Sequence, residues 1–97
     1  MMAPHDVYRC AGDDKWIAIT VETEAEWRAF CDILGHAEWL EDERFADAYA
    51  RQNHQDELDA LITNWTRQYY PEEVMTKLQS AGIAAAPVLD SVEILKN

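Results

Sequence analysis

The chain has 97 residues, which is the size of a single domain with one hydrophobic core. Hydrophobic residues make up 48% of it and four tryptophans are present, so it can fold without a metal or a disulfide framework. Its formal net charge is −11 and its basic residues are scattered singly, which excludes nucleic acid as a partner because phosphate binding needs clustered Lys and Arg.

The sequence also indicates where the protein works. No apolar stretch approaches the roughly 20 residues that cross a bilayer, so we expect no membrane partner. The residues after Met1 lack the basic and apolar regions of a secretory signal. Cys10 and Cys31 form no CxxC pair and indicate reduced thiols rather than a disulfide. These features predict a cytoplasmic protein.

Two β-prone runs, 7–10 and 16–21, are separated by a short segment in which Gly12 and two aspartates tolerate the dihedral angles of a tight turn. This pattern predicts a β-hairpin. Side chains alternate between the two faces of a strand, so the β-branched residues of the second run share one face. We expect these residues to face the core: Ile17, Ile19 and Val21.

A helix is predicted over 24–34. Thr23 and Glu26 have the spacing of a capping box, and Gly35 is suited to end the helix. Its apolar stripe consists of Trp27, Phe30, Cys31 and Leu34. The following segment, 36–47, shows no sustained period and predicts a loop with a short helical turn. Three apolar residues are expected to pin this turn: Trp39, Leu40 and Phe45.

The second half of the chain predicts two more helices and a strand. Asn53 is the expected N-cap of a helix whose stripe is Leu58, Leu61, Ile62 and Trp65. Pro71 begins the next helix, which ends near Gly82. The run 83–88 contains Pro87 and fits an edge strand that joins the hairpin. A further helix is expected to begin near Ser91.

These elements predict an α+β fold in which residues 1–97 form a single small domain. The β-hairpin and the C-terminal strand are expected to form a small antiparallel sheet that packs with three or more helices.

Residue types and spacings give no candidate for catalysis, cofactor binding or metal binding. His5, His36 and His54 are far apart and fit solvated surface positions better than a zinc site. Cys31 lies on a predicted buried stripe, so we expect a core residue rather than a nucleophile. Trp27 and Trp65 are expected to pack in the core, whereas the roles of the other two tryptophans remain open.

Short motifs along the whole chain resemble family III CoA-transferases, also called the carnitine dehydratase and bile-acid-inducible protein family. The N-terminal motifs are Pro4-His5-Asp6-Val7-Tyr8-Arg9-Cys10, Gly12-Asp13, Trp16-Ile17-Ala18-Ile19, Glu26-Trp27, Phe30-Cys31 and Leu34-Gly35. The later motifs are Arg44-Phe45, Asn53, Glu57-Leu58, Trp65-Thr66, Leu78-Gln79, Ala81-Gly82-Ile83, Ala86-Pro87-Val88 and Ser91-Val92. Their order and spacing together carry the resemblance.

The resemblance implies that this chain is the small domain of an enzyme whose Rossmann-like large domain is absent here. In that family an aspartate of the large domain attacks an acyl-CoA thioester, and anhydride and aspartyl-CoA thioester intermediates deliver CoA to a carboxylic acid. The implied partners are the large domain of the same enzyme and the second subunit of a homodimer. Coenzyme A thioester is the parent's substrate and no cofactor is expected in this chain. We therefore expect the chain alone to be inactive.

Some racemases of the family carry a catalytic glutamate just before the first helix. Here Thr23 occupies that position, with Glu22 one residue earlier, so the resemblance makes these two the residues expected near substrate. The mismatch argues against a racemase. Two alternatives stay open at this stage: a free-standing protein-interaction module without catalysis, and a domain of an acyl-CoA racemase or dehydratase of the same family.

Overall fold

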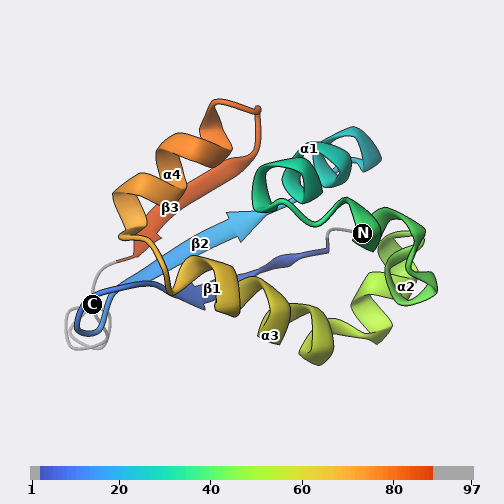
Figure 1. The fold of residues 1–97 in the computed structure, drawn as a ribbon, viewed down its shortest axis with the longest axis horizontal. Helices are drawn as coiled ribbons and strands as arrows, with labels where there is room; N and C mark the ends of the chain where they lie inside the picture. Colours follow the sequence, from blue (N-terminus) through green and yellow to red (C-terminus); the bar gives the residue numbers. More distant parts are fainter. Residues whose placement is uncertain (1–2, 89–97) are drawn as a thin grey trace.

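A computed structural model describes residues 3–88. In chain order, its elements are β1 (His5–Arg9), β2 (Trp16–Thr20), α1 (Glu24–Leu34), the 3-10 helices η1 (Ala37–Glu41) and η2 (Glu43–Phe45), α2 (Ala48–Asn53), α3 (Gln55–Thr66), α4 (Pro71–Gln79) and β3 (Ala84–Val88) (Figure 1). The α+β prediction is confirmed. The helix expected near Ser91 lies outside the described residues.

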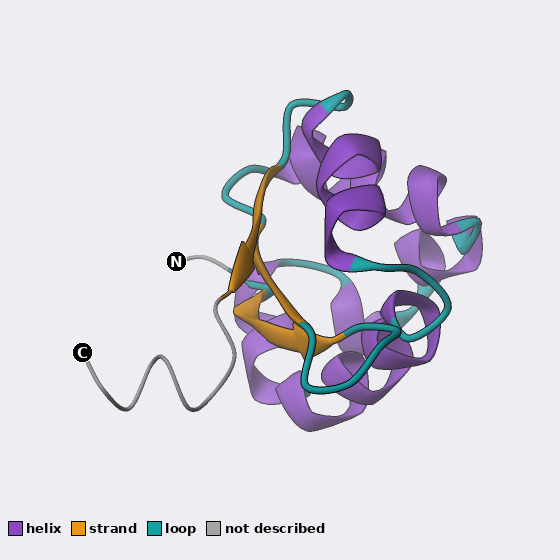
Figure 2. Ribbon diagram, turned by 90° about the vertical axis from the view of Figure 1, so that its left-hand side faces the viewer, coloured by secondary structure: helices purple, strands orange, loops and turns teal. Residues whose placement is uncertain are grey.

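The sheet is antiparallel with the order β1-β2-β3, so the hairpin and the last strand form it together, as predicted. The first strand begins at His5, two residues before the predicted start. The other edge strand, β3, accommodates Pro87 because a proline lacks the amide hydrogen that a central strand needs. Figure 2 shows the helices gathered on one side of this sheet. Within residues 3–88, one face of the sheet is therefore covered and the other is open.

Alternation along the strands decides which side chains the helices cover. The predicted core residues Ile17, Ile19 and Val21 are each at most 1% exposed. In the neighbouring strands Tyr8 and Ala85 point to the same covered face. Since burial of apolar area is the main favourable contribution to folding, this face fixes the register of the sheet.

The local signals of α1 behave as the sequence predicts. Thr23 is the N-cap, and Gly35 ends the helix with φ of 76°, a left-handed conformation that glycine adopts without strain. All four residues of the predicted stripe are buried. The capping box differs in one detail, because Glu26 Oε1 accepts a hydrogen bond from the amide of Glu22 rather than from that of Thr23.

The segment between α1 and α3 is more ordered than predicted. Two 3-10 helices lie where the sequence predicts a loop with a short helical turn. Trp39 and Phe45 are buried as predicted, whereas Leu40 remains 42% exposed and does not pin the turn. A helix that the sequence did not predict, α2, follows Asp47, whose side chain caps it through the amide of Ala50. The prediction of Asn53 as an N-cap is wrong, since Asn53 is the last residue of α2 and His54 precedes α3. His54 makes no side-chain capping hydrogen bond to α3.

The helices pack against the covered face of the sheet, and together they form one hydrophobic core. α3 and α4 occur where predicted, and α4 begins at Pro71, whose missing amide hydrogen is not needed in a first turn. The chain then turns at Gly82, which has φ of 80°, and enters β3. The largest apolar side chains at the centre are Tyr8, Phe30, Phe45, Ile17, Ile19, Leu58, Ile62 and Leu78.

Candidate functional site

Glu22 and Thr23 form an exposed corner between the end of β2 and the start of α1. Thr23 Oγ1 accepts the amide of Glu26 at 3.1 Å, and Glu26 in turn accepts the amide of Glu22 at 2.9 Å. The amide of Val21 donates to Pro4 O at 2.9 Å. Hydrogen bonds thus fix the backbone on both sides of the corner, which we call the Glu22–Thr23 corner.

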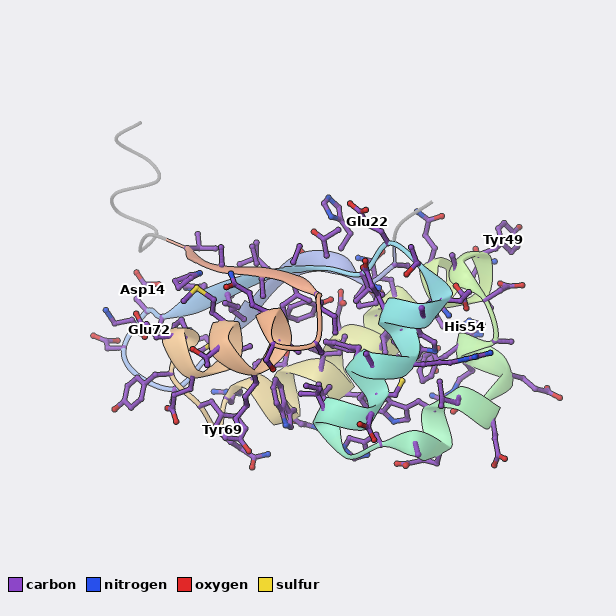
Figure 3. The ribbon with its side chains drawn as sticks, turned by 90° about the horizontal axis from the view of Figure 1, so that it is seen from above. Asp14, Glu22, Tyr49, His54, Tyr69 and Glu72 are labelled. Carbon is purple, nitrogen blue, oxygen red and sulfur yellow. The ribbon has the colours of Figure 1, made fainter. Side chains whose placement is uncertain are left out.

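The three glutamates around this corner have different roles. Glu26 caps the helix, and Glu24 forms an ion pair with Arg51. Within residues 3–88 the carboxylate of Glu22 has no hydrogen bond or ion pair, and Figure 3 shows it projecting outward on the side of the sheet. Negative charge at this end of a helix is favourable, because the macrodipole places partial positive charge there. Of the two residues expected near substrate, Glu22 is therefore the one with a free functional group.

Arg51 is the buried charged residue of this region that the sequence did not single out. It lies in α2, is 1% exposed, and sits 4.5 Å above the ring of Trp27. Its Nε donates to Ala3 O at 2.9 Å and its Nη1 to Phe45 O at 3.1 Å. The remaining hydrogen bonds go to the carboxylate of Glu24. No local pattern predicts these contacts, since the partners lie 6, 27 and 48 residues away.

Neither cysteine is available as a nucleophile. Both thiols are free and buried. Burial raises the pKa of Cys10 to about 11, with the charge of Glu72 contributing, and burial raises the pKa of Cys31 to about 12. A thiol attacks as the thiolate, which is scarce near neutral pH at such pKa values. The prediction that Cys31 is a core residue is confirmed, and Cys10 has the same role.

The tryptophans divide between core and surface. Trp27 and Trp65 are buried, as predicted, and Trp39 is buried as well. Trp16 is only partly buried, with its indole Nε1 donating to Asp14 Oδ1 at 2.8 Å and with Arg9 5.4 Å above its ring. Both flanking groups hold the indole in place on the sheet. Trp16 is thus the tryptophan that a partner can reach.

The histidines do not converge on a metal. Within residues 3–88, no group of three His, Cys, Asp or Glu side chains could hold a metal ion. The exposed His5 bonds Thr20, and His36 stacks on Trp39 with the ring centroids 4.6 Å apart. His54 is not the solvated surface residue that the sequence predicts, because it is only partly exposed at the α2–α3 junction. Its Nδ1 is buried and has no hydrogen-bond partner among the described residues.

The uncovered face of the sheet is the second candidate site. Its side chains fall in three cross-strand rows, and they are His5, Thr20 and Ala84; Val7, Ala18 and Ala86; and Arg9, Trp16 and Val88. We call these nine residues the open sheet face. None of them is acidic, although the chain has 19 acidic residues. Val7 is 43% exposed and Ala86 is exposed, so apolar surface is left uncovered at its centre.

The open sheet face adjoins the Glu22–Thr23 corner. Thr20 ends β2 and belongs to the face, and the corner begins two residues later. In Figure 3 the Glu22 side chain points to the side of the molecule where the strands lie. A partner seated on the face would therefore meet the free carboxylate of Glu22 at its margin.

A shallow depression on α4 is a weaker candidate. It is lined by Glu72, Glu73, Thr76 and Lys77, all exposed and all from one helix. Two carboxylates against one ammonium group disfavour the phosphates of coenzyme A.

Among residues 3–88, none of the helices has the length and apolar character needed to cross a membrane.

Comparisons with known proteins agree on one family. The model of CoA-transferase family III matches residues 1–97. A probable CoA-transferase of Mycobacterium tuberculosis, Rv1866, is 37% identical over 93 residues, which are 96% of this chain and 12% of that protein. The succinyl-CoA–D-citramalate CoA-transferase of Chloroflexus aurantiacus is 30% identical over 96 residues, covering 99% of this chain and 24% of that enzyme.

Solved structures show the same fold. A CAIB/BAIF family protein from Brucella suis superposes with a TM-score of 0.85 at 23% identity, over 99% of this chain and 25% of the other. The hypothetical protein Rv3272 of M. tuberculosis superposes with a TM-score of 0.82 at 25% identity, over 99% of this chain and 27% of the other. The chain thus spans at most about a quarter of these relatives, and it belongs to CoA-transferase family III.

Proposed function

We propose that this chain is the small domain of an enzyme that transfers CoA from an acyl-CoA thioester to a carboxylic acid. The observation that carries the proposal is the family match over residues 1–97 in a chain that spans only 12% and 24% of two curated relatives. Relatives named for D-citramalate and for oxalate point to a small carboxylic acid as the acceptor.

The proposed division of labour leaves the bond-making steps to the large domain. An aspartate there attacks the thioester carbonyl and expels CoA as thiolate, and the thiolate then attacks the aspartyl carbonyl of the anhydride, which gives the aspartyl-CoA thioester and releases the donor acid as its carboxylate. The acceptor carboxylate then attacks the aspartyl-CoA thioester and expels CoA again, and this thiolate attacks the acceptor carbonyl of the second anhydride, which gives the acceptor's CoA thioester and frees the aspartate. The buried, protonated thiols of Cys10 and Cys31 support a passive role for this chain, and its net charge of −11 favours binding of the anionic CoA elsewhere.

Active-site closure and dimer contacts are the proposed contributions of this chain. The open sheet face is the proposed seat of the large domain, because it carries exposed apolar side chains and lacks the acidic residues found elsewhere on the chain. Docking there would bring the Glu22–Thr23 corner to the margin of the interface. Both residues would then lie near the acyl-CoA.

The C. aurantiacus relative provides the test, because its alignment spans 99% of this chain. In a chimera, this chain replaces the aligned segment, and transfer of CoA from succinyl-CoA to D-citramalate is measured by chromatography. The proposal predicts activity for the chimera and none for the 97-residue chain alone. A folded chimera without activity, or transfer by the isolated chain, would contradict it.

One alternative draws on the same observation. The exposed apolar side chains of the open sheet face would also suit a free-standing interaction module without catalysis. Such a module would fail to restore the chimera. A racemase or dehydratase parent of the same family is a further alternative.

A further inference from the structure

Arg51 is the one charged side chain that is buried within residues 3–88. Its guanidinium joins three segments that are distant in sequence: the N-terminal Ala3, the end of η2 at Phe45, and the first turn of α1 at Glu24. Two backbone carbonyls and the face of Trp27 fix the plane of the group. These contacts and the carboxylate of Glu24 together hold the guanidinium in place.

The connections of Arg51 enclose the Glu22–Thr23 corner from both sides. Upstream, Ala3 O accepts from Arg51, and the next carbonyl, Pro4 O, accepts the amide of Val21. Downstream, both oxygens of Glu24 accept from Arg51. The corner spans only the two residues between these anchors. Motion of the guanidinium would thus be transmitted to both ends of the corner.

The ion pair between Arg51 and Glu24 differs from an ordinary surface pair because one of its two partners is buried. Glu24 is 56% exposed, and exposed pairs contribute little because water competes for both partners. Here Arg51 is only 2% exposed in its side chain and presents a rigid fork to the carboxylate. A lysine has a single charged nitrogen and cannot reach the two carbonyls and the carboxylate together.

We propose that Arg51 is a positioning residue that, through Glu24 and the Ala3–Pro4 carbonyls, holds the Glu22–Thr23 corner in the conformation that meets the acyl-CoA. This inference rests on the proposed function for the approach of the substrate, but the holding of the corner is a property of the chain itself. The two parts are tested separately.

The first test measures amide hydrogen exchange by NMR in the 97-residue chain. Glu24→Gln removes the charge without changing the size, and Glu57→Gln is the matched control, because Glu57 is 53% exposed and pairs with Arg44 away from the corner. We expect Glu24→Gln to speed exchange at Val21 and Glu22 about tenfold, the factor of one charge-assisted hydrogen bond. Glu24→Ala should exceed it, since Gln still offers Arg51 an acceptor. Equal exchange in Glu24→Gln and Glu57→Gln would overturn the proposal.

The second test measures steady-state kinetics of Arg51→Lys in the chimera, per folded enzyme as judged by circular dichroism. A positioning role predicts a kcat at least about tenfold lower with KM for succinyl-CoA within about twofold, because transition-state alignment is lost while binding remains. Unchanged constants at reduced folded yield would mean a structural role only. An inactive unsubstituted chimera would refute the proposed function, while the exchange data would still decide whether Arg51 holds the corner.

Discussion

Two adjacent alanines in β3 test whether the sheet is covered on one side only. Ala85 is 6% exposed, lies opposite Ile19 and faces the helices, whereas Ala86 lies opposite Ala18 on the open sheet face and is exposed. Aspartate substitutions at these positions add the same charge one residue apart. Any general effect of charge on a protein of net charge −11 therefore cancels between them.

The structure sets different magnitudes for the two variants. Ala85→Asp places a carboxylate in the core without a cation, which costs several kcal/mol, and about 3 kcal/mol is expected because β3 is an edge strand that can shift toward water. Ala86→Asp should cost no more than about 1 kcal/mol, the range of strand propensity at an exposed site. A domain of this size has about 5 to 15 kcal/mol in total, so both variants should fold.

Urea unfolding followed by tryptophan fluorescence measures these changes. At about 1 to 2 kcal/mol per M urea, Ala85→Asp should lower the midpoint by about 1.5 to 3 M and Ala86→Asp by less than about 1 M. In the chimera, Ala86→Asp should abolish CoA transfer while the domain stays folded, because the charge lies on the proposed docking face. Equal midpoint shifts for the two variants would refute the one-sided sheet, and full activity of Ala86→Asp would refute docking on the open face.

Three further predictions concern single residues. A thiol reagent at pH 8 should label neither Cys10 nor Cys31 until guanidinium unfolds the chain, since burial raises both pKa values; rapid labelling of the native protein would contradict their burial. Asp59 accepts the Tyr8 hydroxyl at 2.8 Å, and burial raises the pKa of its carboxyl group. The folded state therefore favours the protonated carboxyl, and the stability that this group contributes to the fold is lost as the pH rises above about 3.9, the pKa of an unfolded Asp. Asp59→Asn should therefore gain stability relative to the wild type between pH 3 and 7 in thermal melts, and a constant difference would contradict this sign. Gly35→Ala should lower the stability by about 1 kcal/mol, because alanine is strained at the left-handed φ of this position. The added methyl meets no neighbour, so backbone strain is the only expected cost, and an unchanged urea midpoint would rule it out.

Local signals explain what the sequence could predict of the fold. Thr23 and Gly35 mark the ends of α1 through contacts within a few residues, and the alternation of Ile17 with Ile19 identifies the covered face of the sheet. Such features need no knowledge of the tertiary structure. The α+β fold, its three strands and the core position of Trp27 were predictable for this reason.

Distant contacts explain what the sequence could not predict. α2 has only six residues and no apolar stripe, and its buried side chain is Arg51, a residue type that is almost never buried without a partner. The carbonyls and the carboxylate that satisfy it come from segments far along the chain. Alternation in β2 likewise identifies one core face but not whether the opposite face is covered. The prediction of Glu22 and Thr23 as substrate-proximal came from the family resemblance, and it stays a prediction.

The mass and activity of the gene product in its source cells test the central claim most directly. Purification through an antibody against this domain, followed by intact mass spectrometry and a CoA-transfer assay of the same fraction, measures both. The account predicts a polypeptide several times heavier than 11.2 kDa that moves CoA from an acyl-CoA to a carboxylic acid. A product of 11.2 kDa that catalyses the transfer without a partner would contradict the account.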